Sequence, residues 1–139
     1  MPNDKEFAKN VVSLISRLQN LCEGFDETNK SAVITSKVKI LLELSKAQSV
    51  TPSIIKHNIG LAKSNVAIIC NRLIEEGLVL KSKDSLDTRE ISYSITEAGK
   101  KFLEEFLLKT KRNFESELAY KNNIKQIDAA VNDLLGLVE

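Results

Sequence analysis

The sequence predicts a mainly α-helical fold that contains one small β-ribbon. Apolar residues recur at helical spacing through most of the 139 residues. The period changes once, after Gly77, where residues 78–95 read as two short strands joined by a charged tip, DSLDTRE. A helix followed at once by such a ribbon is typical of a winged helix-turn-helix core, in which the helix fits a DNA major groove. We expect this lobe over about residues 35–98, with flanking dimerisation helices over 4–25 and 99–138.

Composition places the chain among ordinary soluble globular proteins of one domain, because 42% of its residues are apolar and 28% are charged. Cys22 and Cys70 are too few for a disulfide framework or a zinc site, so no metal and no cofactor are expected. No apolar run is long enough to span a bilayer, and the N-terminus lacks the apolar region of a signal peptide. We therefore expect a cytoplasmic protein with no membrane partner.

The net charge of +1 does not by itself indicate a nucleic-acid binder. From Lys56 to Arg89 the sequence has six basic and four acidic residues, which leaves a local charge of +2. Two of the acids, Glu75 and Glu76, lie at the far end of the predicted helix 63–76. The position of the charges is therefore more informative than their sum.

The first half of the chain reads as a series of amphipathic helices. In residues 4–25 one helical face carries Phe7, Val11, Leu14, Ile15, Leu18, Cys22 and Phe25. Residues 26–33 read as a loop, and a second helix runs from about Val38 to Leu44. Thr51-Pro52 then gives a cap followed by proline at the first helical position of a short helix, 52–58, that ends at Gly60.

The helix predicted over residues 63–76 has two distinct faces. Its packed face carries Val66, Ile69, Cys70 and Leu73, and its opposite face carries Ser64, Ile68, Asn71 and Glu75. Gly77 fits a left-handed C-terminal cap. In the return strand of the ribbon, three apolar residues (Ile91, Tyr93 and Ile95) alternate with polar ones, which predicts one buried and one wet face.

The last third of the chain predicts two further helices. Thr96 caps a long helix that reaches about Tyr120, and the helix over 124–138 carries a heptad-like apolar seam. A winged lobe needs only about 70 residues, so these helices bury their apolar stripes within the chain or against a second copy. A two-fold homodimer is the simpler answer, and its candidate interface residues are Val11, Leu14, Leu18, Phe114, Leu118, Ile127, Val131 and Leu134.

The order of these signals resembles the multiple antibiotic resistance regulator (MarR) family over about residues 35–105. The resemblance rests on KILLELSKAQSVTPSIIKHNIGLAKSNVAIICNRLIEEGLVLKS and DSLDTREISYSITEAGKKFLEE, above all on NRLIEEGLV, Asp87-Thr88-Arg89 and ITEAGKKFL. It implies a homodimeric transcriptional regulator, a repressor in many relatives, that binds a palindromic double-stranded DNA operator. It also implies a pocket for an unknown small-molecule effector. The sequence departs from the family at Ala62, where a capping Ser or Asp is usual, and at Ile68, where a polar residue is frequent.

The candidate DNA-binding residues are Thr51, Ser53, Lys63, Ser64, Asn65, Ala67, Ile68, Asn71, Lys83, Asp87 and Arg89. Asparagine pairs with adenine, and Ile68 or Ala67 can touch a thymine methyl group. Thr51, Ser53 and Lys63 lie near helix starts, where phosphates are favoured, and Lys83 is a phosphate candidate on its strand. The resemblance implies that Arg89 enters a minor groove and that Asp87 orients it. The alternative readings are a solvated helix face and a surface ion pair.

The sequence also bears on two other functional classes. A winged helix can also serve as a protein-interaction module without DNA binding, and the low net charge and the predicted exposure of Ile68 and Leu86 favour it. An enzyme is not expected, because the chain has one histidine, His57, and no glycine-rich phosphate loop or paired carboxylates. Cys70 is expected in the core, His57 on the surface, and a redox role for Cys22 stays open.

Overall fold

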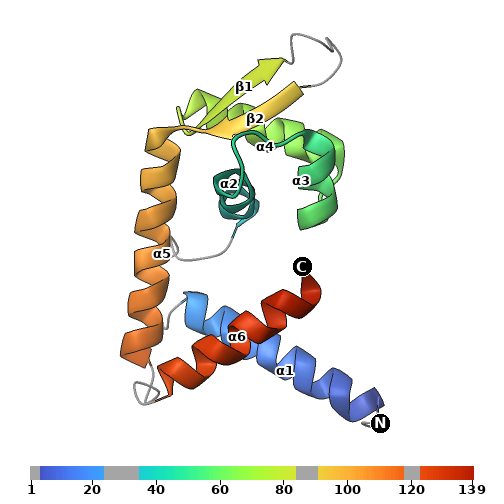
Figure 1. Cartoon of the computed structure of the whole chain (residues 1–139), viewed down its shortest axis with the longest axis vertical. Helices are drawn as coiled ribbons and strands as arrows, with labels where there is room; N and C mark the ends of the chain where they lie inside the picture. Colours follow the sequence, from blue (N-terminus) through green and yellow to red (C-terminus); the bar gives the residue numbers. More distant parts are fainter. Residues whose placement is uncertain (1–3, 24–34, 84–90, 118–122) are drawn as a thin grey trace. The chain divides into compact units, whose positions relative to one another are not determined.

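The computed structural model describes residues 4–23, 35–83, 91–117 and 123–139. These residues form α1 (Asp4–Glu23), α2 (Ser36–Ser45), α3 (Pro52–Ile59), α4 (Lys63–Glu75), β1 (Val79–Lys83), β2 (Ile91–Ile95), α5 (Glu97–Glu117) and α6 (Ile124–Val138) (Figure 1). The predicted fold class, mainly helical with one small ribbon, is confirmed. The chain divides into two compact units. We call Val33–Leu108 the winged lobe, and Met1–Ala32 with Lys109–Glu139 the helical unit.

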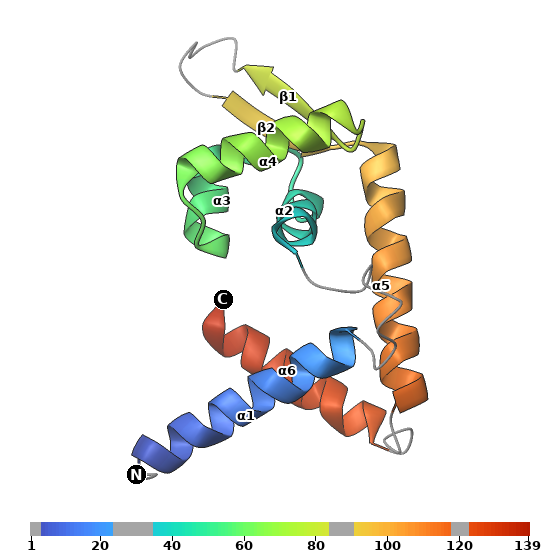
Figure 2. The same cartoon turned by 180° about the vertical axis from the view of Figure 1, so that it is seen from behind.

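The core of the winged lobe is built from aliphatic side chains around α2. Helix α2 contacts α3, α4 and β2, and both views show it beside α3 and below α4 and β2 (Figures 1 and 2). The largest fully buried side chains are Ile40, Leu41, Leu44, Ile55, Val66, Cys70, Leu73 and Val79. Leu103 and Phe106 of α5 are also buried in this core. The hydrophobic effect therefore fixes α4 in place by the face that carries Val66, Cys70 and Leu73.

The ribbon pairs β1 and β2 antiparallel, from Val79 opposite Ile95 to Lys83 opposite Ile91. Val50 adds an isolated bridge to Tyr93, with hydrogen bonds of 2.9 Å in both directions. The predicted alternation along β2 is only partly right. Tyr93 is buried, but its four neighbours in the strand, serines and isoleucines alike, are half-buried. A two-stranded ribbon covers neither face fully, and the Ser82 and Ser92 hydroxyls bond across it at 2.9 Å.

The ends of α3 and α4 follow local chemistry. The Thr51 hydroxyl accepts a hydrogen bond from the Ile54 N–H at 3.4 Å, and Gly60 closes α3 at a φ of 72°. Gly77 has a φ of 77° after α4, and the Leu78 N–H donates to the Leu73 carbonyl at 2.9 Å. This second pattern is a Schellman motif. It holds Leu78 in the helix cap, so β1 begins at Val79, one residue later than predicted.

Thr96 joins the end of α4 to the start of α5. Its hydroxyl accepts from the Gly99 N–H at 3.0 Å, which is the predicted cap, and donates to the Gly77 carbonyl at 2.7 Å. Its N–H donates to the Leu78 carbonyl at 3.0 Å. Gly99 leaves no space for a side chain, because a Cβ there would meet the Leu78 carbonyl oxygen and Ile95. The first turn of α5 therefore packs directly on the chain that leaves α4.

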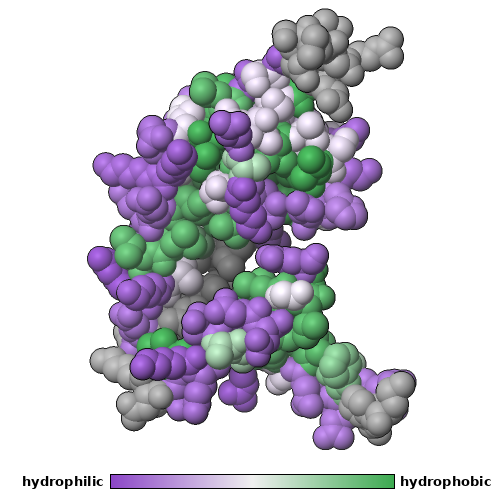
Figure 3. Space-filling view, viewed as in Figure 1, coloured by the Kyte–Doolittle hydropathy of each residue, from purple (hydrophilic) through white to green (hydrophobic). Residues whose placement is uncertain are grey.

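The helical unit contains α1, α6 and the end of α5, and its helices bury little within this chain. Helix α6 has no buried residue, and α1 is exposed along residues 4–20 except at Leu18, which is half-buried. Figure 3 shows apolar surface over this unit. The exposed apolar side chains are Phe7, Val11, Val12, Leu14, Ile15, Ile124, Val131, Leu134, Leu135, Leu137 and Val138. Among the described residues, no helix is long and apolar enough to cross a membrane.

Candidate nucleic-acid interface

Helices α3 and α4 form a helix-turn-helix, with the turn at Gly60–Ala62 and α4 anchored by its apolar face. The opposite face of α4 lies in solvent as predicted: Ser64, Ile68, Asn71 and Glu75 are all exposed. Asn65 is exposed beside them, whereas Ala67 is half-buried. Ile68 keeps 51% of its surface accessible. The structure thus brings four of the predicted major-groove residues together on accessible surface, and Ala67 to its edge.

The N-terminal end of α4 is electropositive and uncapped. Ala62 makes no side-chain hydrogen bond to the first turn, which confirms the missing cap. No acidic residue lies in that turn, and Lys63 begins it. The unpaired N–H groups and the helix dipole favour an anion at this end. A phosphate near Lys63 would therefore meet both backbone donors and an ammonium group.

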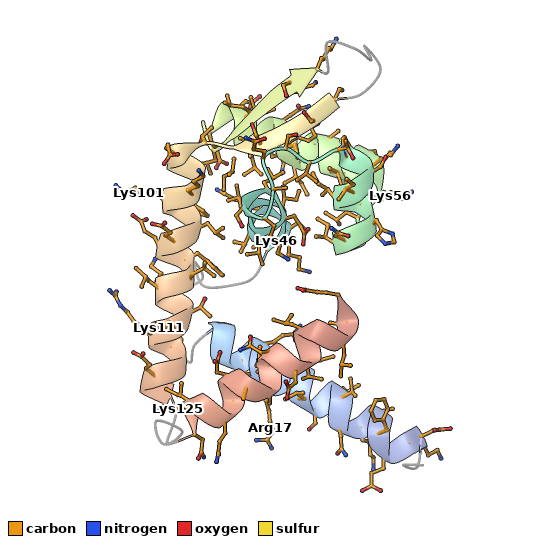
Figure 4. The ribbon with its side chains drawn as sticks, in the orientation of Figure 1. Arg17, Lys46, Lys56, Lys101, Lys111 and Lys125 are labelled. Atoms are coloured by element: carbon orange, nitrogen blue, oxygen red, sulfur yellow. The ribbon has the colours of Figure 1, made fainter. Side chains whose placement is uncertain are left out.

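Helix α3 contributes basic and apolar groups. Lys56 and His57 are exposed in its last turn, and Lys56 points away from the core (Figure 4). Ser53 is exposed, whereas Thr51 is half-buried and its hydroxyl already caps the helix. Ile54 is 50% exposed and was missed by the sequence reasoning. The pair Ile54-Ile55 gave no sure signal, since adjacent helix residues can both be buried, as Ile40 and Leu41 of α2 are.

The ribbon supplies exposed lysines at Lys81 and Lys83. Leu80, the second residue of β1, is 60% exposed. The tip residues Asp87 and Arg89, like Leu86, lie outside the described residues, so their roles stay predictions. The described part of the ribbon therefore carries the phosphate candidate Lys83 but not the minor-groove candidates.

The C-terminal end of α4 is tied to α2. Lys37 Nζ lies 2.6 Å from Glu76 Oε2 and 4.5 Å from the centre of the Phe102 ring. This ion pair balances the charge of Glu76, one of the two acids at the far end of the helix. Beside it is a hollow of about 380 Å³ between the start of α2 and the end of α4, lined by Thr35, Ser36, Lys37, Ile69, Arg72, Leu73 and Glu76.

Cys70 and His57 are the cysteine and the histidine of the described part of the winged lobe. Cys70 is fully buried, and this burial raises the pKa of its thiol to about 11, so the thiol is neutral and unreactive near neutral pH. His57 is exposed, as expected. No group of His, Cys, Asp or Glu within the described ranges could hold a metal ion. The side chain of Cys22 lies outside the described part of the chain, so its redox role is untested.

The geometry defines a winged helix-turn-helix lobe joined to long flanking helices. No protein-family model matches the sequence, and no curated protein matches it. Solved structures do match its fold. YusO from Bacillus subtilis is 23% identical over the full length of both chains, with a TM-score of 0.66. A mutant of MarR from E. coli, complexed with operator DNA, is 14% identical over 96% of this chain and 94% of that one, with a TM-score of 0.68.

A third match is BpsR from Bordetella bronchiseptica, whose DNA binding is regulated by 6-hydroxynicotinic acid. It is 15% identical, covers 96% of this chain and 99% of that chain, and has a TM-score of 0.67. At these identities the shared property is the fold. The chain therefore has the fold of the MarR-type regulators, and the expected resemblance is confirmed at that level.

Proposed function

We propose that this chain is a transcriptional regulator, a repressor, that binds a palindromic double-stranded DNA operator in the cytoplasm. The observation that carries the proposal is the outward face of α4. Val66, Cys70 and Leu73 fix this helix to the core, and Asn65, Ile68 and Asn71 lie exposed on the free side. A helix held in this way fits a major groove, and Lys63, Ser53 and Lys83 surround it as phosphate contacts. One of the matching folds binds operator DNA.

The proposal includes a homodimer formed by the helical unit. Val11, Leu14, Val131 and Leu134 are all exposed although they are apolar. Leu18 and Ile127 are half-buried, Leu118 lies outside the described residues, and nothing is described of the Phe114 side chain. A two-fold partner would remove these stripes from water and set two copies of α4 about one helical turn of DNA apart.

We also propose that a small molecule regulates DNA binding, as 6-hydroxynicotinic acid does for BpsR. Such a ligand acts by binding one conformation better than the other, so it shifts the population with the DNA-competent spacing of α4.

Fluorescence anisotropy with DNA from upstream of the chain's own gene tests the main proposal. Affinity should fall steeply as salt rises, because phosphate contacts release counterions. A flat titration at low salt would reject DNA binding. We expect Arg89→Ala to weaken binding about ten-fold, which is typical of one lost groove contact. Arg112→Ala, at an exposed arginine of α5, is the matched control and should bind like the native chain.

Sedimentation equilibrium tests the dimer. Val131→Asp puts a charge on the proposed seam and should yield monomers, because an unpaired buried charge is strongly unfavourable. Ala129→Asp, on the same exposed helix but off the seam, should leave the dimer intact. A dimer that survives Val131→Asp removes this seam from the interface.

One observation favours a second function, a protein-interaction module. The winged lobe exposes Ile54, Ile68 and Leu80 by 50%, 51% and 60%. Scattered exposed apolar residues are common, however, and the polar residues around Ile68 suit DNA better than an apolar partner. The same anisotropy titration separates the two functions.

A further inference from the structure

The outward face of α4 has an unusual composition for a helix that reads DNA. Ser64, Asn65 and Asn71 supply its uncharged polar groups, Ile68 lies among them, and Glu75 lies in the last turn. Arginine and lysine are the side chains that pair with guanine O6 and N7, whereas asparagine pairs with adenine N6 and N7. An apolar side chain instead contacts the 5-methyl group of thymine.

The cations of α4 lie away from the middle of this face. Its single arginine, Arg72, lies in the last turn and lines the hollow beside the start of α2. Lys63 is the first residue of the helix, about 100° behind Ser64 on the wheel, where it suits a phosphate. No side chain that prefers guanine therefore stands between Ser64 and Asn71.

Ser64, Ile68 and Asn71 form one stripe along α4. They are spaced by four and three residues, so they lie on the same side of the helix. At 1.5 Å per residue the stripe is about 10 Å long, which matches about three base-pair steps of 3.4 Å. Ile68 lies at the centre of this stripe and is exposed, with 51% of its surface accessible. Its neighbours in the sequence, Ala67 and Ile69, are less exposed than Ile68.

We infer that the part of the operator half-site under α4 is a core of A·T base pairs. In this core Ile68 contacts the methyl group of a thymine, and Asn71 and Asn65 pair with adenines. A G·C pair at the centre would place a cytosine amino group against Ile68 and leave that donor without an acceptor, which disfavours it. The inference rests on the proposed function, because it requires α4 to enter the major groove.

Selection of duplexes from a random DNA pool with the full-length chain tests the inference. We expect A·T pairs over about three positions in each enriched half-site. In the enriched duplex, replacing the core thymines by deoxyuridine removes only the methyl groups. This change should weaken binding of the native chain about five-fold or more, and should leave binding of Ile68→Ala unchanged.

Ile54→Ala is the matched control, because Ile54 is an equally exposed isoleucine on the neighbouring helix α3. It should retain the native sensitivity to the methyl groups. Enrichment of G·C pairs, no base preference, or equal binding of thymine and deoxyuridine duplexes would overturn the inference while salt-dependent DNA binding persists. Absence of binding to any duplex at low salt would overturn the proposed function and this inference together.

Discussion

Gly99→Ala tests the close approach of α5 to the chain that leaves α4. A Cβ at this position would meet the Leu78 carbonyl oxygen and lie 2.7 Å from Ile95 Cγ1. The same carbonyl accepts the Thr96 N–H at 3.0 Å, so the methyl group cannot be accommodated without moving hydrogen-bonded backbone. Overpacking of this kind costs about 1–3 kcal/mol, against about 0.5–1 kcal/mol that alanine contributes within a helix. We expect a net loss of about 1–2 kcal/mol.

Urea unfolding followed by circular dichroism at 222 nm measures this loss. Protein concentration is held fixed, because association would add to the apparent stability. Gly136→Ala is the control, since Gly136 also lies in a helix but no atom lies within 4 Å of its added Cβ. It should leave the free energy of unfolding unchanged or raise it by up to about 1 kcal/mol. The reasoning is refuted if Gly99→Ala is as stable as the native chain, or if both variants lose the same amount.

Three further predictions concern the winged lobe. Ala62→Ser should supply the cap that α4 lacks and raise the free energy of unfolding by about 1 kcal/mol in the same titration; no gain would mean that the first turn is already satisfied. The stability that the Cys70 thiol contributes is fully present below pH 9 and should be lost as the pH rises toward about 11. The reason is that burial raises the folded-state pKa of Cys70, so the unfolded chain releases this proton first. Cys70→Ala should flatten the fall of the unfolding free energy over this pH range, and an equal fall in both proteins would contradict the role given to Cys70. Lys37→Met should cost no more than about 1 kcal/mol, because the ion pair with Glu76 is partly exposed, and 1 M NaCl should reduce the difference; a loss unaffected by salt would show another origin.

The helix boundaries were predictable because their signals are local. Thr51 before Pro52, the left-handed glycines Gly60 and Gly77, and the Thr96 cap each act within a few residues of the helix they delimit. The two faces of α4 were predictable for a similar reason, since helical periodicity alone separates Val66 and Cys70 from Ile68. Helical periodicity identifies the apolar face of a helix, and because the lobe has one core, that face is the buried one.

The features that the sequence did not predict depend on residues far apart in the chain. Val50 bridges to Tyr93 of β2 from another segment, and this contact has no local signal. The pair of Lys37 and Glu76 joins residues 39 positions apart and has no local signal. The proposed dimer seam is a different case, because periodicity identifies an apolar face on α6 but not the surface that covers it. The roles of Asp87 and Arg89 stay predictions.

The bonds of Thr96 have a consequence for the proposed regulation of DNA binding. Its hydroxyl and N–H hold the Gly77 and Leu78 carbonyls at the end of α4, and its hydroxyl also holds the Gly99 N–H in the first turn of α5. These bonds, with the absent side chain of Gly99, make the meeting point of α4 and α5 a stiff joint rather than a hinge. A rotation of the first turns of α5 is then converted into a tilt of α4 instead of being absorbed between them. Thr96→Val would remove the two hydroxyl bonds but keep the Thr96 N–H bond to Leu78 and the close packing at Gly99, so it should loosen this joint without separating the two helices.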